Sequence, residues 1–188
     1  MRLSRPRVEP LPESEWTETA RATIEPTRAM ADGKVFNIFS TLANHPDLLK
    51  RWMVFANHVL VKSTLPPRER EILILRIGWL CRAEYEWSQH VLIGRAVGLS
   101  AAEIDQIADG PEAPGWSTAD ATLLRAVDEL HGDAFLSDAT WQGLAAVYST
   151  QQIMDVIFTV GQYTLVSMAL NSLGVQLDEG LPRMRGEG

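Results

Sequence analysis

Two ionisable side chains stand one helical turn apart in a segment whose other inward positions are apolar. Glu86 and His90 belong to the stripe Ala83, Glu86, His90, Ile93 and Val97, which has the three-and-four spacing of a single helix face. Because Ile93 and Val97 direct this stripe toward the core, we expect both ionisable groups to be buried. A buried charge needs a partner, so the two are predicted to hydrogen-bond to each other or to a third group.

A second carboxylate is expected at the same height. If the helices on either side of Cys81 form an antiparallel pair, Glu71 lies ten residues before the turn and His90 nine residues after it. At a rise of about 1.5 Å per residue, the two side chains reach nearly the same level. Glu71, Glu86 and His90 would then converge in a mostly dry pocket, where burial and neighbouring charges tune pKa values for proton transfer.

Other interpretations of these residues stay open. Buried Glu and His side chains can form a purely structural network, and at i,i+4 they can share a metal ion. Only three ligands and no second histidine stand together, so we predict no metal site. Tyr85 and Trp87 flank Glu86 and, with Ala83, are candidates for lining the substrate pocket. Aromatic residues at this spacing also occur in ordinary cores.

The elements that would position these groups are helices, because apolar residues recur at helical spacing and strand-like alternation is absent. The segment 68–80 follows two prolines that suit a helix start, and apolar side chains around nearly its whole circumference predict a buried helix. Two capping boxes are recognisable, Ser100 with Glu103 and Ser149 with Gln152. The other expected helices cover 47–62, 83–97, 100–108, 117–131, 138–148 and 149–171.

These helices are expected to form one all-α domain over residues 30–175. Residues 1–29 are interpreted as a basic, solvated arm and a first helix. Residues 176–188 are interpreted as a flexible tail, because glycines and a proline interrupt them.

Composition and charge exclude several classes of function. The chain has 17 Lys and Arg against 24 Asp and Glu, a formal net charge of −7, without the basic cluster that a nucleic-acid partner requires. Cys81 is the single cysteine, so no intramolecular disulfide can form. No signal peptide is recognisable, and Asp155, Gln162 and Asn171 interrupt the most apolar segment, so no membrane span is predicted. We therefore expect a cytoplasmic protein without a membrane partner.

A resemblance to a known family is carried by residues 65–104, LPPREREILILRIGWLCRAEYEWSQHVLIGRAVGLSAAEI. This stretch resembles the core motif of the carboxymuconolactone decarboxylase-like proteins, which include alkyl hydroperoxidase D. Their motif is a glutamate, a C-x-x-C pair, three residues and a histidine. Glu71 falls on the glutamate and His90 on the histidine, whereas Ala83 and Glu86 occupy the two cysteine positions. The resemblance extends over roughly residues 30–175 and implies the all-α helical bundle of that family.

The same resemblance implies a function. Peroxidase members attack peroxide with one thiolate and resolve the product with the other, and this chain lacks that pair. The decarboxylase branch keeps the glutamate and histidine without needing thiols. We therefore expect a cofactor-free enzyme acting on a small carboxylated or lactone-like metabolite. His90 would be the proton donor or base, Glu71 would orient it, and Glu86 would be a second acid.

Two other functions stay open. One is a peroxiredoxin-like antioxidant activity that uses Cys81 with a thiol from elsewhere, and the other is a binding or assembly protein without catalysis. Several expected helices are apolar on more than one side, which predicts subunit contacts. The family resemblance also implies a trimer or hexamer with its sites near subunit boundaries. We therefore expect a homo-oligomer, a trimer or hexamer or alternatively a dimer, in which a neighbouring chain helps to complete the pocket around His90.

Overall fold

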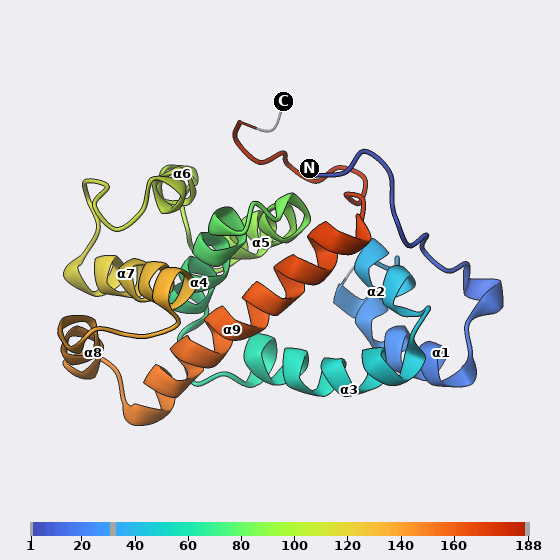
Figure 1. The fold of residues 1–188 in the computed structure, drawn as a ribbon, viewed down its shortest axis with the longest axis horizontal. Coiled ribbons are helices and arrows are strands. Elements are labelled where there is room, and N and C mark those ends of the chain that lie inside the picture. The colour runs from blue at the N-terminus through green and yellow to red at the C-terminus, as the bar shows by residue number, and fades with distance from the viewer. Residues whose placement is uncertain (1, 31–32, 187–188) are drawn as a thin grey trace.

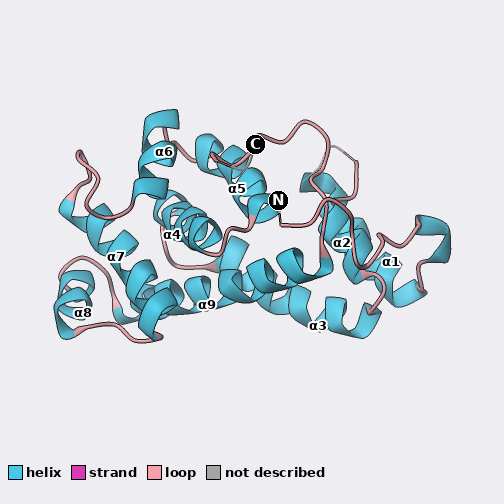
Figure 2. Ribbon diagram, turned by 45° about the horizontal axis from the view of Figure 1, so that its top comes forward, coloured by secondary structure: helices cyan, strands magenta, loops and turns pink. Residues whose placement is uncertain are grey.

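The computed structural model describes residues 2–30 and 33–186, and every regular element within these ranges is a helix (Figure 2). This result confirms the all-α prediction. The α-helices are α1 Glu18–Ile24, α2 Asn37–Leu42, α3 Pro46–Asn57, α4 Pro67–Leu80, α5 Glu84–Ala96, α6 Ala101–Asp109, α7 Thr118–Asp133, α8 Asp138–Ala145 and α9 Thr150–Leu173. Short turns of other helix types cover Glu13–Glu15, Glu25–Met30 and His58–Lys62, the last of them a π-helical extension of α3.

Helix α4 lies at the centre of the main core and packs against α5, α6, α7 and α9. All its residues from Arg70 to Gly78 are buried, which confirms the prediction from its apolar circumference. Figure 1 shows α9 running diagonally through the molecule, with α4 to α8 on one side and α1 to α3 on the other. The site residues of α4 and α5 are therefore held inside the larger of these two groups of helices.

Local signals in the sequence set several helix ends. Both predicted capping boxes form, at the starts of α6 and α9. Gly174 adopts the left-handed conformation after α9, with φ of 71°, and its N–H donates to the Leu170 carbonyl.

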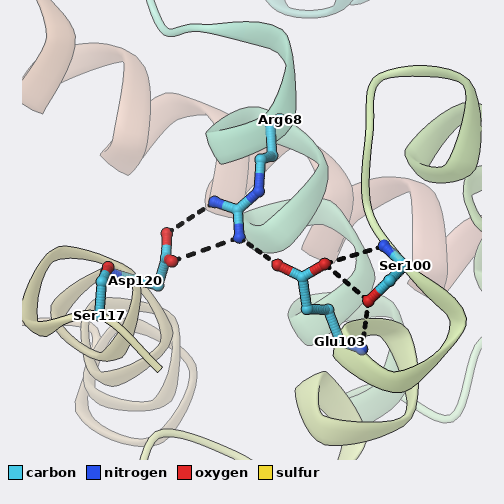
Figure 3. A network of polar contacts seen from close by, with 5 residues as sticks. All are labelled: Arg68, Ser100, Glu103, Ser117 and Asp120. Carbon is cyan, nitrogen blue, oxygen red and sulfur yellow. Dashed lines mark hydrogen bonds and ion pairs between the residues drawn. The ribbon is translucent and has the colours of Figure 1, made fainter. Parts of the chain in front are cut away.

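One arginine of α4 ties this helix to α6 and α7 (Figure 3). Arg68 donates to Asp120 of α7 at 2.9 Å and to Glu103 of α6 at 2.5 Å. Glu103 also accepts from the backbone N–H of Ser100. That backbone hydrogen bond and the Arg68 guanidinium lower the pKa of Glu103 to about 2. Glu103 is thus at once a helix cap and a tertiary contact.

Helices α1 to α3 enclose a separate small core around Trp16, Ile24, Phe39 and Leu49. The sequence did not predict α2. It has only six residues, and Phe36 at its N-cap offers no side chain that accepts a hydrogen bond. Its packing between α3 and the C-terminal segment, rather than a local signal, accounts for it.

Residues 176–186 belong to the segment predicted to be a flexible tail, and in the structure they contact the rest of the chain; residues 187–188 lie outside the described part of the chain. Met184 is buried in the main core, and the Asp178 carboxylate accepts hydrogen bonds from the Tyr85 hydroxyl and from the N–H of Asn37. Glycine and proline prevent a helix here, but they leave side chains that pack across α5. The segment is irregular and nevertheless docked.

The described part of the N-terminal arm also lies on the protein. The backbone N–H groups of Arg7 and Val8 donate to the Leu173 carbonyl, and Arg2 donates to the Cys81 carbonyl. These bonds satisfy carbonyls at the ends of α9 and α4 that have no partner within their own helices.

Helix α9 is long and apolar enough to cross a membrane by length and composition, with a mean hydropathy of 1.5 over its best window. The sequence analysis predicted no membrane span here, because it required an apolar run without polar interruptions. Half of that window is buried inside the protein, and its polar residues serve tertiary contacts: Asp155 accepts from Thr64, and Asn171 donates to the Cys81 carbonyl. These contacts tie α9 to the segment before α4 and to the turn after it.

Candidate functional site

Helices α4 and α5 approach each other closely at two glycines. A Cβ atom added to Gly78 would lie 3.6 Å from the backbone nitrogen of Trp87, and one added to Gly94 would lie 3.3 Å from Leu75 and 3.9 Å from the Cβ atom of Glu71. The antiparallel pair predicted from the sequence is therefore present. This pairing places Glu71 of α4 beside the second half of α5.

His90 lies between two carboxylates. Its Nδ1 atom is 2.6 Å from Glu71 Oε2, and its Nε2 atom is 2.9 Å from Glu86 Oε1. All three side chains are buried, and Glu71 is fully enclosed. The structure thus brings together the three residues that the sequence singled out for proton transfer.

Arg70 completes the charge balance of this cluster, and the sequence analysis missed it. Its Nε atom donates to Glu71 Oε1 at 3.2 Å, and the residue is buried. With His90 protonated, two positive groups face the two carboxylates Glu71 and Glu86. An arginine beside a glutamate in a helix that is apolar all round was the available signal, because neither charge can be buried unpaired.

Tyr163 of α9 was also missed. Its ring meets the His90 imidazole edge to face, with centroids 5.0 Å apart and an interplanar angle of 85°. Burial and the neighbouring charges of Glu86 and Glu71 raise the pKa of Tyr163 well above its usual value, so the phenol stays neutral. No spacing rule connects it to α5, since the contact depends on how α9 packs.

The two carboxylates set the protonation state of His90. Burial alone lowers the pKa of an imidazole, but the charges of Glu71 and Glu86 and their hydrogen bonds raise that of His90 from 6.5 to about 10. At neutral pH both ring nitrogens therefore carry protons and donate to carboxylates. The resting state suits a proton donor rather than a base.

The three predicted pocket residues lie in different surroundings. Ala83 is fully buried at the start of α5. Trp87 stands in the main core with its ring 5.3 Å from that of Trp79, and Tyr85 donates to Asp178 at 2.5 Å. Of the three, Tyr85 lines a small cavity, which it shares with Arg2, Leu3 and the end of α9. The three side chains thus do not form one pocket around His90.

Cys81 lies in the turn between α4 and α5, outside the charged cluster. Its sulfur is 4.0 Å from Nδ1 of His131. Burial raises the pKa of the thiol, despite the opposing effects of Ser167 and Arg2. The thiolate that peroxide chemistry needs is therefore disfavoured at this position.

Within residues 2–30 and 33–186, no group of three or more His, Cys, Asp or Glu side chains is arranged to hold a metal ion. The cluster itself offers a physical reason, because each ring nitrogen of His90 is already engaged by a carboxylate.

Comparison with known protein families supports the resemblance carried by residues 65–104. Residues 46–129 match the model of the carboxymuconolactone decarboxylase family. No curated protein matches the chain significantly.

Solved structures share the fold at low sequence identity. An uncharacterised peroxidase-related protein from Ralstonia eutropha JMP134, with an alkylhydroperoxidase AhpD core, is 19% identical with a TM-score of 0.82; the alignment covers 94% of this chain and 95% of that one. A peroxidase-related protein from Silicibacter sp. TM1040 is 15% identical, with coverages of 94% and 91% and a TM-score of 0.76. A cysteine-to-alanine variant of the debrominase Bmp8, in complex with 2,3,4-tribromopyrrole, is 16% identical, with coverages of 94% and 94% and a TM-score of 0.76.

Proposed function

We propose, from the premise that this chain belongs to the carboxymuconolactone decarboxylase family, that Glu71, Glu86 and His90 form a proton-transfer site. The substrate class is a small carboxylated or lactone-like metabolite. The observation that carries the proposal is the position of His90 between two buried carboxylates, 2.6 Å from one and 2.9 Å from the other. Such an arrangement stores a proton in a dry environment, where general acids are tuned.

The proposed chemistry needs one proton donor. When the bond to the carboxyl group breaks, CO2 leaves and the bonding electron pair stays on carbon as an enolate. That carbon must then receive a proton. The imidazolium of His90 supplies it, through Nε2 or through Glu86, which shares a hydrogen bond with that nitrogen. Solvent then returns a proton to the cluster.

The proposal gives the two carboxylates, Glu71 and Glu86, different roles. Glu71 is fully enclosed and bonded to both Arg70 and His90, so it acts on a substrate only by orienting the imidazole and stabilising its cation. It is a positioning residue. Glu86 is the carboxylate that stands at the second cysteine position of the motif, and the proposal assigns it to the substrate side.

The antioxidant alternative has less support. It requires a reactive thiolate, and burial raises the pKa of the Cys81 thiol. A non-catalytic role is favoured by a different observation, namely that Arg70, Glu71, Glu86 and His90 are all buried and paired with one another. A charged network that is complete in itself can serve the fold alone.

We also propose that the protein works in the cytoplasm as a homo-oligomer, a trimer or hexamer or alternatively a dimer. The apolar circumference of α4 no longer supports this proposal, because its residues from Arg70 to Gly78 are buried within a single chain. The support that stays is the solvent-facing side of α9, where Met154, Phe158, Leu165 and Met168 are about half exposed.

The test is CO2 release from carboxymuconolactone and from a simple β-keto acid, run in D2O. We expect turnover with one deuterium placed on the carbon that lost CO2, and a loss of roughly 100-fold or more in His90→Gln. His131→Gln, which changes an exposed imidazole outside the cluster, is the control. If no acid in the panel releases CO2 faster than in buffer while both variants fold normally, the cluster is structural.

A further inference from the structure

Arg70 leaves one end of the charged cluster without a partner. Within the cluster it uses only its Nε atom, which donates to Glu71 Oε1 at 3.2 Å. Its Nη1 and Nη2 atoms form no hydrogen bond with any residue that the structure describes, and neither atom is sealed from solvent. The residue as a whole is nevertheless only 8% exposed. A mostly buried guanidinium therefore presents two free nitrogen donors at the protein surface.

Both carboxylates of the cluster are engaged elsewhere. Glu71 accepts from Arg70 Nε with one oxygen and is bonded to His90 with the other. Glu86 is bonded to the second ring nitrogen of the same imidazole at 2.9 Å, and the imidazolium offsets its charge. A guanidinium binds a carboxylate through two parallel N–H···O bonds and is more weakly hydrated than an ammonium group. A carboxylate of a ligand therefore matches the free end of Arg70 in both charge and shape.

The Tyr163 hydroxyl is a third donor close to this point. Tyr163 is only 7% exposed, yet its hydroxyl is not sealed from solvent and forms no hydrogen bond with the described residues. Its ring packs against the His90 imidazole. Burial and the charges of Glu86 and Glu71 raise the pKa of Tyr163, whereas the charge of Arg70 opposes the rise. The phenol is therefore neutral, within electrostatic reach of the guanidinium, and able to donate to an anion.

We propose that Arg70 and Tyr163 form a carboxylate-binding subsite beside the proton-transfer cluster. Arg70 Nη1 and Nη2 donate to the two oxygens of a ligand carboxylate, and the Tyr163 hydroxyl donates a further hydrogen bond to one of them. The inference rests on the proposed function, because it takes the cluster as the place that the substrate enters. An ion pair with the carboxyl group that leaves as CO2 would stabilise the ground state more than the transition state. The carboxylate bound here is therefore one that the substrate retains.

The experiment measures binding alone and compares acetate with acetamide, its uncharged counterpart of nearly the same shape, at constant ionic strength. The readout is the Nε–H signal of Arg70 in ¹H–¹⁵N spectra of the full chain, assigned by its loss in Arg70→Lys. Acetate should move this signal in a saturable way and bind roughly 10-fold more tightly than acetamide, because its hydrogen bonds are charge-assisted. Equal affinities of the two probes for the wild type would overturn the proposal.

Two variants test the two recognition residues. Tyr163→Phe keeps the ring beside His90 and removes the hydroxyl, so acetate should bind roughly 3- to 10-fold more weakly, as followed by the Arg70 signal. Arg70→Lys keeps a positive charge beside Glu71 but loses the fork, and should weaken acetate binding roughly 10-fold, as followed by the Tyr163 ring signals. Arg95→Lys, which changes an exposed arginine of α5, should leave the affinity unchanged.

The outcomes separate this subsite from the decarboxylase proposal. Acetate affinity that is unchanged in Tyr163→Phe or in a folded Arg70→Lys protein would overturn the subsite. Release of CO2 by a wild type that does not bind acetate at Arg70 would also overturn it, and would leave the proton-transfer function standing. Binding of acetate that depends on both residues, in a protein that releases no CO2 from any acid, would support the subsite and refute decarboxylation.

Discussion

His90 should keep its proton at a pH where ordinary histidines have lost theirs. Glu71 and Glu86 raise its pKa from 6.5 to about 10, so we expect the imidazole to be charged at pH 8. The ¹⁵N shifts of labelled histidine side chains distinguish the protonated ring from the neutral one. One of the four histidines should show the protonated pattern at pH 8, and that pattern should disappear in His90→Gln. A His90 signal that titrates near 6.5 would contradict the charge arrangement described above.

The same pair of carboxylates makes stability depend on pH in a definite direction. The pKa of His90 is higher in the folded state than in the unfolded chain, so its contribution is complete below pH 6.5 and is lost as the pH rises toward about 10. We therefore expect the difference in unfolding free energy between wild type and His90→Gln to shrink over that range. Urea unfolding of both proteins at several pH values measures it. A difference that stays constant or grows would contradict the prediction.

Cys81 should be dispensable. Burial raises the pKa of its thiol, and the sulfur lies near His131 rather than near His90. We expect Cys81→Ser to retain the decarboxylase rate within about twofold, because no step of the proposed reaction uses sulfur. Loss of both CO2 release and peroxide consumption in this variant would instead support the thiol-based alternative.

The sequence predicted the core of the site but not its surroundings. Glu71, Glu86 and His90 could be placed together because helical spacing and an antiparallel turn are local geometry. Arg70 and Tyr163 could not be placed in this way. The predicted burial of its helix indicates that Arg70 needs a partner, but spacing does not say which carboxylate it meets, and the contact of Tyr163 depends on the packing of α9.

At the scale of elements, Arg76 of α4 holds the end of α6 in place. It donates to the carbonyls of Ile107 and Ala108 and forms an ion pair with Asp128 of α7. Gly110 follows directly, with φ of 97°, and a Cβ atom there would lie 2.8 Å from a guanidinium nitrogen of Arg76. A side chain at this position would therefore be strained and would require Arg76 to shift.

A matched pair of substitutions separates backbone strain from this collision. Gly98 also has a positive φ, 103°, but an added Cβ would meet open space. We expect Gly98→Ala to cost about 1–3 kcal/mol in unfolding free energy from strain alone, and Gly110→Ala to cost more because Arg76 must also move. Thermal and urea unfolding give both values. Equal losses would mean that Arg76 adapts freely.

For the C-terminal segment, composition predicted the absence of a helix but not the side-chain contacts. Glycine and proline after position 176 correctly exclude a helix, yet Asp178 and Met184 anchor the segment over α5. A segment without regular structure can still pack through its side chains, and composition does not predict those contacts. Helix α2 shows the converse, since it forms without a capping signal.

At the scale of the whole molecule, α9 carries two apolar faces. One is buried in the chain, and the other has the solvent-facing positions 151, 154, 158, 161, 165, 168 and 172, which alternate steps of three and four. Five of these are Met154, Phe158, Gly161, Leu165 and Met168. Apolar residues repeating at this period are typical of a face that packs against another helix. Gly161 leaves open space at the middle of the stripe, where a knob from a second helix can enter.

We therefore expect the 20.9 kDa chain to elute as a trimer or hexamer, or alternatively as a dimer, in size exclusion with light scattering at micromolar concentration. Phe158→Glu places a charge in the stripe and should shift the mass toward a single chain, because a buried unpaired carboxylate disfavours the contact. Phe135→Glu, an equally drastic change at an exposed position off the stripe, should leave the mass unchanged. A wild-type mass near 20.9 kDa would refute the assembly and, with it, the expectation that a neighbouring chain completes the surroundings of His90.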